Sequence, residues 1–537
     1  MNETSPAPIS HRSEILRLMR WLFSWAVVRR FLLILAWAAT IIALFYAEEN
    51  WRGRRAWDKY RKQLEAKGAQ LDYASLIPKP VPDEQNFAAN PFVQSWFQQK
   101  TSFRNRWADA YDRISKEVPG PVKGWTRRPW DLAAWQMASD AIRSNTAFKS
   151  GQRFESHKLD RDSRAKAAPA VLELLATNDT NFAILRAFSS RPYSRYPVIY
   201  DLDNPWGILI PHLANLGPTG ARLQLRACAE LAAGQTERAF DDVQLMFYLA
   251  DSCRDEPFLM SYVSWLARLR VTLQPLWEGL FEHRWSEAQL REFQRHLENY
   301  DLLAEMKRPL EGERAAGILT ANVLYRQKFR LHDLLGDNAN SSGSALADFF
   351  CRIAPHGWFY QEQLNYCRLY DGQINGGFDV QARRVFPKIL RAHEHDLEKE
   401  IAGGWLGKAP SAVLHHRLLA SLLLPALVRV PERAAGTQIA IDQAMLACAL
   451  ERYRLAKGEF PEKLESLAPT FVAKIPNDLL SGEAYKYRRL PDGQFVLYSV
   501  GWDEKDDGGT PDENVNVGSQ QEHHGDWVWQ SFPAEGK

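Results

Sequence analysis

Phe31–Ala47 reads FLLILAWAATIIALFYA, a run of 17 residues without one charged side chain. At about 1.5 Å per residue, a helix over this run is about 25 Å long, slightly less than the hydrocarbon thickness of a bilayer. Arg29 and Arg30 can extend back to the interface at one end, and Tyr46 and Trp51 offer interfacial rings at the other. The sequence therefore predicts a transmembrane helix over residues 31–47.

A cleaved signal peptide is the alternative interpretation of this run. A 30-residue leader is long, however, and the small-x-small triplet Ala36-Trp37-Ala38 lies inside the apolar stretch, which favours a retained anchor. The positive-inside rule does not decide the orientation, because residues 1–30 carry five arginines and residues 48–67 carry seven basic against four acidic residues. Since a long following domain can translocate despite its charge, we expect the N-terminus in the cytoplasm and residues 48–537 outside it.

Composition excludes several classes of protein. The 537 residues are 45% hydrophobic and 25% charged, which excludes a disordered chain, a collagen-like repeat and a small disulfide scaffold. The 67 basic and 65 acidic residues leave a formal net charge of +2, so no bulk electrostatic argument for nucleic acid exists. We therefore expect a large buried core and no nucleic-acid partner.

The five cysteines contain no C-x-x-C pair, which excludes a zinc ribbon and a thioredoxin-type redox motif. Cys228 and Cys448 lie in apolar helical patterns and are expected as packed free thiols. Cys351 and Cys367 are the one pair for which a disulfide is worth considering. Their spacing permits a bridge in an oxidising compartment, but the sequence does not show that its geometry is met.

The chain as a whole is predicted to be mostly α-helical, with a small α+β module at its C-terminal end. Residues 77–82, IPKPVP, favour extended backbone and are predicted to form a stiff spacer, although an ordinary surface loop fits equally well. A polar break is expected at 336–344. We divide the chain into a cytoplasmic tail (1–30), the transmembrane helix (31–47), a stalk helix with the Pro-rich connector (48–86), a helical domain (87–409) and the C-terminal module (410–537).

Helical periodicity is strongest from Gly217 onward. Apolar residues recur at spacings of four and three up to Gly234, where the chain is expected to turn into a second, antiparallel helix. The spacing from Gly234 to Ala239 resembles the turn of a tetratricopeptide unit, and an isolated helical hairpin is the alternative. Pro257 is expected to open a third helix, and Ser286 with Gln289 predicts a capping box at the start of a fourth.

The C-terminal module is predicted to pass from helix to sheet. Residues 415–458 are typical of one long helix or two joined helices that stop at Gly458. Alternation over 485–489 and 495–499 around Pro491-Asp492-Gly493 predicts a hairpin, and Trp527–Trp529 offers a third strand.

This helix and sheet carry a local resemblance to a known family. The residues that carry it are LAKGEFP at 455–461, IPND at 475–478, Gly482, Tyr485, Tyr487 and LYSVGWD at 497–503. Over roughly 100 residues they resemble the C-terminal domain of the major pseudopilin of type II secretion. Phe31 follows Arg30 instead of a glycine, and no glutamate interrupts the apolar run, so the resemblance implies a borrowed module and not a pseudopilus subunit. The whole chain is similar to single-span bacterial membrane proteins with this tail, which implies the inner membrane.

The resemblance implies a calcium site in the loop after the last of these strands. Here the loop 503–513 reads DEKDDGGTPDE, with six carboxylates and one lysine, and a glycine-rich acidic turn suits a hard cation that needs six to eight oxygen ligands. It is not an EF-hand, because Lys505 occupies the third position of that motif. A merely solvated acidic turn is the alternative. The predicted ligands are Asp503, Asp506, Asp507 and Asp512, with the carbonyl of Val500 as a further candidate.

No catalytic motif is present, so no catalytic residue is assigned. Residues 403–409 lack the glycine and hydroxyl residue of a P-loop, and His393-Glu394-His395 is not H-E-x-x-H. The sequence thus favours a membrane-anchored extracytoplasmic interaction or structural protein with protein partners in the cell envelope. An envelope enzyme with a site assembled from distant residues is the alternative, for which His212, Asp201 and Asp203 are candidates.

Overall fold

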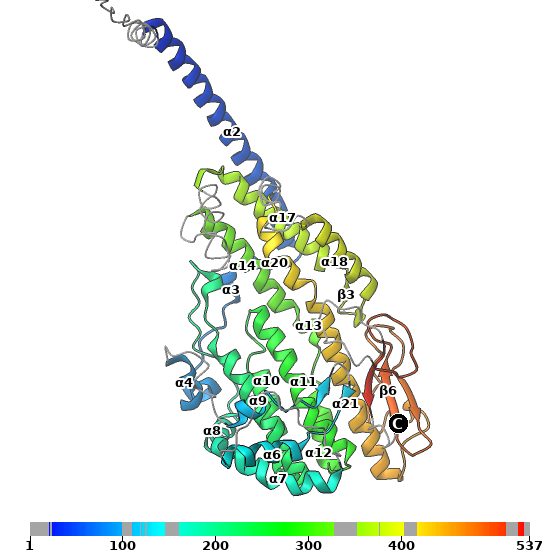
Figure 1. The fold of residues 1–537 in the computed structure, drawn as a ribbon. Helices are drawn as coiled ribbons and strands as arrows, with labels where there is room; N and C mark the ends of the chain where they lie inside the picture. The colour runs from blue at the N-terminus through cyan, green and yellow to red at the C-terminus, as the bar shows by residue number, and fades with distance from the viewer. Residues whose placement is uncertain are drawn as a thin grey trace, which may run out of the picture. The chain divides into compact units, whose positions relative to one another are not determined.

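A computed structural model shows a chain that is mostly helical, with three small antiparallel sheets (Figure 1). This confirms the predicted mostly-α class and the antiparallel sheet near the C-terminus. The predicted polar break at 336–344 and the P-loop-like stretch 403–409 lie outside the described residues. The structure describes residues 21, 24–98, 110–118, 120–123, 126–144, 160–326, 352–374, 376–401, 416–511 and 525–530.

The chain forms two compact units, each built from segments that are far apart in sequence. Unit 1 comprises residues 1–68 and 321–365, and unit 2 comprises residues 69–320 and 366–537. The division falls inside two helices, α14 (Lys307–Tyr325) and α17 (His356–Ile374). The predicted boundary between residues 409 and 410 lies in the stretch 402–415, outside the described residues.

Unit 1 contains the helix α2 (Trp25–Ala66), which runs without a break through the predicted span and the predicted stalk helix. The two expected helices are joined because no proline interrupts residues 25–66. The helix ends at Ala66, with Lys67 as its C-cap, before Gly68 with a φ of +80°. Ile34 and Trp37 are 67% and 68% exposed, so no surface among the described residues covers these side chains of α2. Within the described residues, α2 alone is long and apolar enough to cross a membrane.

The lower part of α2 packs closely on α17 through two glycines. A Cβ atom at Gly53 would lie 2.2 Å from the carbonyl oxygen of Gly357, and one at Gly357 would lie 1.9 Å from the carbonyl oxygen of Glu49. The amide of Gly357 donates to Asn50 Oδ1 at 2.7 Å. Only glycine fits at both positions, and the close contact fixes α2 against α17 directly after the apolar run.

Unit 2 is an array of helices around a central helix, α9. The connector at 77–82 is extended at Ile77 and Pro82 and contains neither helix nor strand, as predicted. Besides the parts of α14 and α17 that belong to this unit, its helices before the C-terminal module are α3 (Tyr73–Leu76), α4 (Pro91–Gln98), α5 (Ala110–Ile114), α6 (Leu132–Arg143), α7 (Arg161–Leu175), α8 (Asp179–Phe188), α9 (Pro211–Ala232), α10 (Thr236–Asp251), α11 (Leu259–Phe281), α12 (Glu287–Leu297), α13 (Leu302–Glu305) and α18 (Pro387–Ile401).

The predicted helical hairpin is confirmed as α9 and α10, which pack against each other and against α11 (Figure 1). α9 begins six residues earlier than the periodicity indicated, at Pro211, because a proline suits the first helical position. Gly234, with a φ of +75°, turns the chain into α10 as predicted. One face of α9 packs on α6 and α7 through Leu225 and Cys228, and the opposite face packs on α4 and α8 through Leu216. The tetratricopeptide-like interpretation stays a prediction.

The capping box at the start of α12 is also confirmed. Ser286 Oγ accepts from the Gln289 amide at 3.3 Å, and Gln289 Oε1 accepts from the Ser286 amide at 3.0 Å. Trp285 is buried and lies edge-on to Phe293, with ring centroids 5.0 Å apart. Local sequence therefore fixes both where this helix begins and which side is buried.

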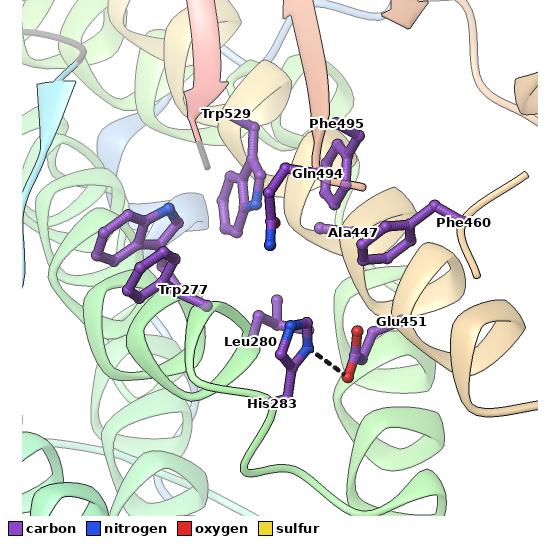
Figure 2. Close-up of a pocket in the computed structure, with 10 residues that line it drawn as sticks. Trp277, Leu280, His283, Ala447, Glu451, Phe460, Gln494, Phe495 and Trp529 are labelled. Atoms are coloured by element: carbon purple, nitrogen blue, oxygen red, sulfur yellow. Dashed lines mark hydrogen bonds and ion pairs between the residues drawn. The ribbon is translucent and has the colours of Figure 1, made fainter. Parts of the chain in front are cut away.

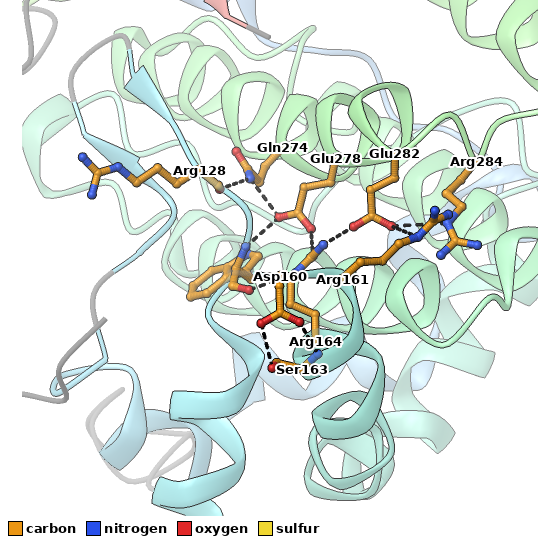
Figure 3. A network of polar contacts seen from close by, with 10 residues as sticks. Arg128, Asp160, Arg161, Ser163, Arg164, Gln274, Glu278, Glu282 and Arg284 are labelled. Atoms are coloured by element: carbon orange, nitrogen blue, oxygen red, sulfur yellow. Dashed lines mark hydrogen bonds and ion pairs between the residues drawn. The ribbon is translucent and has the colours of Figure 1, made fainter. Parts of the chain in front are cut away.

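A buried ionic network joins α7 to α11 (Figure 3). The guanidinium of Arg164, which is 2% exposed, pairs with both Glu278 of α11 and Glu282, the C-cap residue of that helix. Glu278 Oε1 also accepts from the Trp130 amide and from Gln274 Nε2, each at 2.9 Å. Because each buried charge has an opposite charge in contact, the network holds α7 on α11 without leaving an isolated ion.

The C-terminal module consists of α20 (Leu418–Leu427), α21 (Val430–Lys457) and the strands β5 (Lys486–Arg489), β6 (Phe495–Ser499) and β7 (Trp527–Gln530). The predicted pair of joined helices, the stop at Gly458 and all three strands are confirmed. The sheet is antiparallel in the order β5-β6-β7, with Tyr487 opposite Leu497 and Leu497 opposite Trp529. Two-stranded sheets pair β1 (Val122–Lys123) with β2 (Thr126–Arg127) and β3 (Phe378–Asp379) with β4 (Arg384–Val385).

The polar residues quoted for the resemblance hold this helix and sheet together. Tyr485 Oη donates to Asp442 Oδ2 of α21 at 3.0 Å, and Ser499 Oγ of β6 donates to Asp478 at 2.9 Å. Tyr487 Oη donates to the carbonyl of Pro461 at 2.7 Å. α21 also packs on α11, α12 and α13, so the module and the helical array share one unit.

Four cysteines lie in the described residues, and all are buried free thiols: Cys228, Cys253, Cys367 and Cys448. Burial raises the pKa of the Cys253 thiol to about 12, and it also raises the pKa of the other three. Cys228 and Cys448 are packed thiols as predicted. Cys367 is free in this structure, and Cys351 lies outside the described residues.

Candidate functional site

A pocket opens in unit 2 where the end of α11 faces the C-terminal sheet (Figure 2). Its cavity of about 30 Å³ is large enough for one ordered water. Figure 2 shows Trp277, Phe495 and Trp529 around one space, with Gln494 extending from the turn before β6. We call this site the aromatic pocket, and its lining residues are Trp277, Leu280, Phe281, His283, Ala447, Glu451, Phe460, Gln494, Phe495 and Trp529.

A histidine and a buried carboxylate form the polar end of the aromatic pocket. His283 Nδ1 lies 2.9 Å from Glu451 Oε1, and His283 has a φ of +55°, a backbone conformation that is uncommon outside glycine. Burial raises the pKa of Glu451, but hydrogen bonds from Arg454 and His283 outweigh burial and hold it below its usual value. Glu451 is therefore an anion at neutral pH, 2% exposed, at the edge of an aromatic cavity.

Chemically, the aromatic pocket is built to receive a small group and not a large ligand. Aromatic rings bind apolar surface and cations, and Glu451 adds a hydrogen-bond acceptor with a negative charge. Trp277 and Trp529 are buried, whereas Gln494 and Phe281 are half-buried. The pocket is therefore open to solvent on the side of Gln494, next to the hairpin turn.

A second, polar cavity of about 150 Å³ lies where α8, α9 and α10 meet. Arg226 Nε donates to Asp242 Oδ2 at 2.6 Å, and Arg226 Nη1 pairs with Asp179 Oδ1 at 2.6 Å. Arg186 of α8 also pairs with Asp242. We call this site the ionic cavity, and its lining residues are Asp179, Arg186, Arg226, Glu230, Arg238, Asp241 and Asp242.

Glu230 is the unusual residue of the ionic cavity. Its side chain is fully buried, and neither carboxylate oxygen has a hydrogen-bond partner, although Arg238 Nε lies 3.2 Å from Oε1 without hydrogen-bond geometry. Burial and then the neighbouring Asp242 raise the pKa of Glu230 to about 8, against the effect of the nearby arginines. At neutral pH Glu230 is therefore mainly a neutral acid that can donate a proton.

Three of the four predicted calcium ligands lie in the described residues, and Asp512 lies outside them. Asp506 Oδ1 accepts from Tyr498 Oη at 2.9 Å and from the Gly508 amide at 3.1 Å. Asp503 Oδ1 accepts from the Lys505 amide at 3.2 Å, so these carboxylates shape the loop locally. The main-chain carbonyl of Asp507 accepts a hydrogen bond from Thr510 Oγ1 at 2.9 Å.

The structure adds Asp526, at the start of the third strand, to this acidic loop. Asp526 Oδ2 accepts from the Gly509 amide at 2.6 Å, whereas Oδ1 is buried without a partner. Burial raises the pKa of Asp526, and the charges of Asp506 and Asp507 raise it further. No group of three histidine, cysteine or acidic side chains arranged to hold a metal ion is found in the part of the chain that the structure describes. The calcium site remains a prediction.

The candidate residues for the enzyme alternative have different surroundings in the structure. His212 of α9 is buried and stacks on Tyr196, with ring centroids 4.1 Å apart, while its Nε2 lies 3.0 Å from the carboxylate of Glu256. Asp201 and Asp203 are exposed, and Asp201 Oδ1 accepts from the Asp203 amide at 2.9 Å within their own loop.

Sequence reasoning missed both cavities. The available signal for the ionic cavity was the pair Arg226 and Glu230, which are four residues apart and interrupt the apolar pattern of α9. The aromatic pocket combines α11, α21 and two strands, and no spacing along the chain connects these elements.

Comparison of this chain with known proteins identifies no relative from which a role could be transferred. The chain matches no family model, no curated protein and no solved structure. The role of the chain therefore has to be argued from its own residues.

Proposed function

We propose that this protein is an interaction protein anchored in the bacterial inner membrane, with α2 crossing the bilayer once and the chain after it outside the cytoplasm. The observation that carries the proposal is the uncharged run 31–47, whose large side chains project from α2 uncovered. An exposed apolar surface of this length costs free energy in water and gains it in hydrocarbon.

Membrane extraction tests the anchor. The full-length chain is expected to stay in the membrane pellet after alkaline carbonate washing, and Leu35→Glu with Ile41→Glu is expected to release it, because each charge near the bilayer centre costs roughly 3 kcal/mol. Lys59→Glu with Lys62→Glu, further along the same helix, is the matched control and should stay in the pellet. Wild-type protein in the soluble fraction would contradict the proposed anchor.

Thiol labelling tests the orientation separately. Lys67 is exposed just after α2, and the four described native thiols are buried. Lys67→Cys is expected to react with a membrane-impermeant maleimide in intact spheroplasts. Labelling that appears only after lysis would place residues 48–537 in the cytoplasm and leave the anchor intact.

The aromatic pocket supports the interaction role, because buried aromatic residues around a small cavity can hold the anchoring side chain of a partner. The proposed partner group is a side chain that ends in a positive charge or a hydrogen-bond donor and faces Glu451. A photo-crosslinking residue at Gln494 is expected to yield a defined adduct in intact cells, and the same residue at exposed Glu465 serves as the control. An adduct pattern identical at both positions would count against the pocket.

We further propose that calcium stabilises the acidic loop through Asp503, Asp506, Asp507 and Asp512. Asp526 supports this, because its buried Oδ1 lacks a partner beside two other carboxylates. Calcium is expected to raise the melting temperature of the full-length protein over that in chelator, and Asp507→Asn is expected to remove most of the rise. Asp492→Asn, in the neighbouring hairpin turn, is the control and should keep the rise. A wild-type melting temperature that is equal with and without calcium would contradict the proposal.

The ionic cavity favours one second candidate, an envelope hydrolase that uses Glu230 as a proton donor. Its arginines could bind an anionic substrate, and a protonated Glu230 could protonate a leaving group. Hydrolysis of a model phosphate or carboxylate ester that disappears in Glu230→Gln, with the fold intact, would support this candidate. An equal rate in the variant would exclude Glu230 as the proton donor.

A further inference from the structure

A third cavity lies on α9, α10 and α11, away from the charges of the ionic cavity. Its volume is about 180 Å³, several times the roughly 30 Å³ that one water takes in the liquid. Leu216, Met246 and Leu249 are buried in its floor, and Gly217 and Ala267 are exposed at its mouth. We call it the α9–α11 cavity, and its lining residues are Leu213, Leu216, Gly217, Gly220, Met246, Leu249, Ser264, Ala267, Arg268, Val271 and Thr272.

Arg268 is the one charged residue in this mostly apolar lining. Its side chain is 7% exposed. Nη2 donates to the Leu213 carbonyl at 3.0 Å and Nη1 to Cys253 Sγ at 3.4 Å, whereas Nε has no hydrogen-bond partner.

No carboxylate in the described residues forms an ion pair with Arg268. Glu256, a buried carboxylate of the same region, is engaged by His212 and by Ser261. Elsewhere in unit 2 the buried arginines Arg164 and Arg226 are each paired with two carboxylates. A buried guanidinium without a counter-charge is costly, and an anion that enters the cavity would remove that cost.

We propose that the α9–α11 cavity binds a medium-chain alkyl carboxylate, with the carboxylate on Arg268 and the chain against the apolar lining. The lining favours an alkyl chain over a peptide, because a peptide would bring backbone amides and carbonyls that need partners. The lining offers only two hydroxyls for that purpose, and Thr272 Oγ1 already donates to the Arg268 carbonyl at 2.9 Å.

Gly220 provides a way to fill the cavity without disturbing the fold. A Cβ atom at Gly220 meets nothing within 4 Å, and a larger residue in place of a helical glycine favours the helix. Gly220→Leu is therefore expected to fold and to occupy the space of the alkyl chain. Gly372 of α17 is a matched control, because its Cβ position is equally open and it does not line this cavity.

Calorimetric titration of sodium octanoate into the full-length protein in lipid nanodiscs, with empty nanodiscs as the blank, tests the proposal. Octanoate is expected to bind the wild type and Gly372→Leu alike, and to bind Gly220→Leu at least tenfold more weakly. Arg268→Met is expected to lose octanoate but to keep 1-octanol, which has the same chain without the charge.

Three results would overturn the proposal: no heat above the blank for the wild type, equal binding to Gly220→Leu, or equal affinity for octanoate and octanol in the wild type. A short acetylated peptide with a free C-terminus serves as the competing ligand. If it binds in a Gly220-dependent way while octanoate does not, the cavity is a peptide site and the alkyl carboxylate is excluded.

Discussion

At the scale of single residues, the unusual feature is the buried acid on α9. Glu230 has no hydrogen bond to either oxygen, and its carboxylate shares the ionic cavity with Asp242, which two arginines already neutralise. Ionising Glu230 therefore places a poorly compensated charge inside the protein. The cost of that charge appears as a pKa raised to about 8 from the ordinary 4.5.

This pKa shift predicts a pH-dependent stability that Glu230→Gln removes. The folded state holds the proton more tightly than the unfolded chain, so the stabilisation is complete below about pH 4.5 and is lost as the pH rises to about 8. Between about pH 5 and 8.5 the wild type should lose on the order of 1 to 4 kcal/mol more unfolding free energy than the variant. Urea unfolding across this pH range measures the difference. If the unfolding free energies of the wild type and the variant change in parallel with pH, Glu230 is ionised throughout.

At the scale of elements, α12 shows how far local sequence can define a helix. Its first turn is closed by reciprocal bonds between Ser286 and Gln289, and Trp285 covers the entry from the side. None of this needs a partner from elsewhere in the chain. The helix consequently begins at the residue that the sequence indicated.

Removing the side-chain cap of α12 should lower the unfolding free energy by the amount that such caps usually contribute. Ser286→Ala is expected to lower the unfolding free energy by about 1 kcal/mol, because the Gln289 amide loses its acceptor. Ser286→Asp keeps an acceptor at the same place and should stay within a few tenths of a kcal/mol of the wild type. Chemical denaturation of both variants provides the measurement, and equal losses would mean that the cap bond is not what stabilises the turn.

At the scale of the whole molecule, unit 2 is joined by charges far apart in sequence. Arg164 on α7 pairs with Glu278 of α11 and with Glu282, the C-cap residue of that helix, more than 100 residues later (Figure 3). Arg164 is as deeply buried as the apolar core beside it. The link between α7 and α11 therefore depends on charge compensation at Arg164.

Removing only the cation of this network should lower the unfolding free energy more than removing the cation together with its carboxylate. Arg164→Met leaves Glu278 buried without a cation, while Glu282 keeps Arg284 at 3.2 Å, and the variant is expected to lose about 3 to 5 kcal/mol of unfolding free energy. Adding Glu278→Gln removes the carboxylate that has lost its cation and should recover part of the lost unfolding free energy. If the double variant is no more stable than the single one, the cost comes from packing and not from the unpaired carboxylate.

Much of the fold could be predicted because its signals are local. The apolar run, the turns at Gly234 and Gly458, the cap at Ser286 and the hairpin around Pro491-Asp492-Gly493 each lie within a few residues. The unbroken α2 was not predicted in full, since the polar residues after Ala47 suggested a new element although nothing there stops a helix. The cavities were missed because their residues come from helices and strands that no spacing relates.

By itself, the sequence determined where the hairpin of α9 and α10, the start of α12 and the C-terminal helix and strands lie, and that one helix is too apolar for water, because propensity, capping and hydrophobic period act over one or two turns. Only the tertiary structure decided which charges are compensated. Arg226 and Arg268 look alike in the sequence, yet among the described residues Arg226 pairs with two carboxylates and Arg268 with none. The free energy of a buried charge depends on its neighbours in space, and long-range packing alone supplies those neighbours.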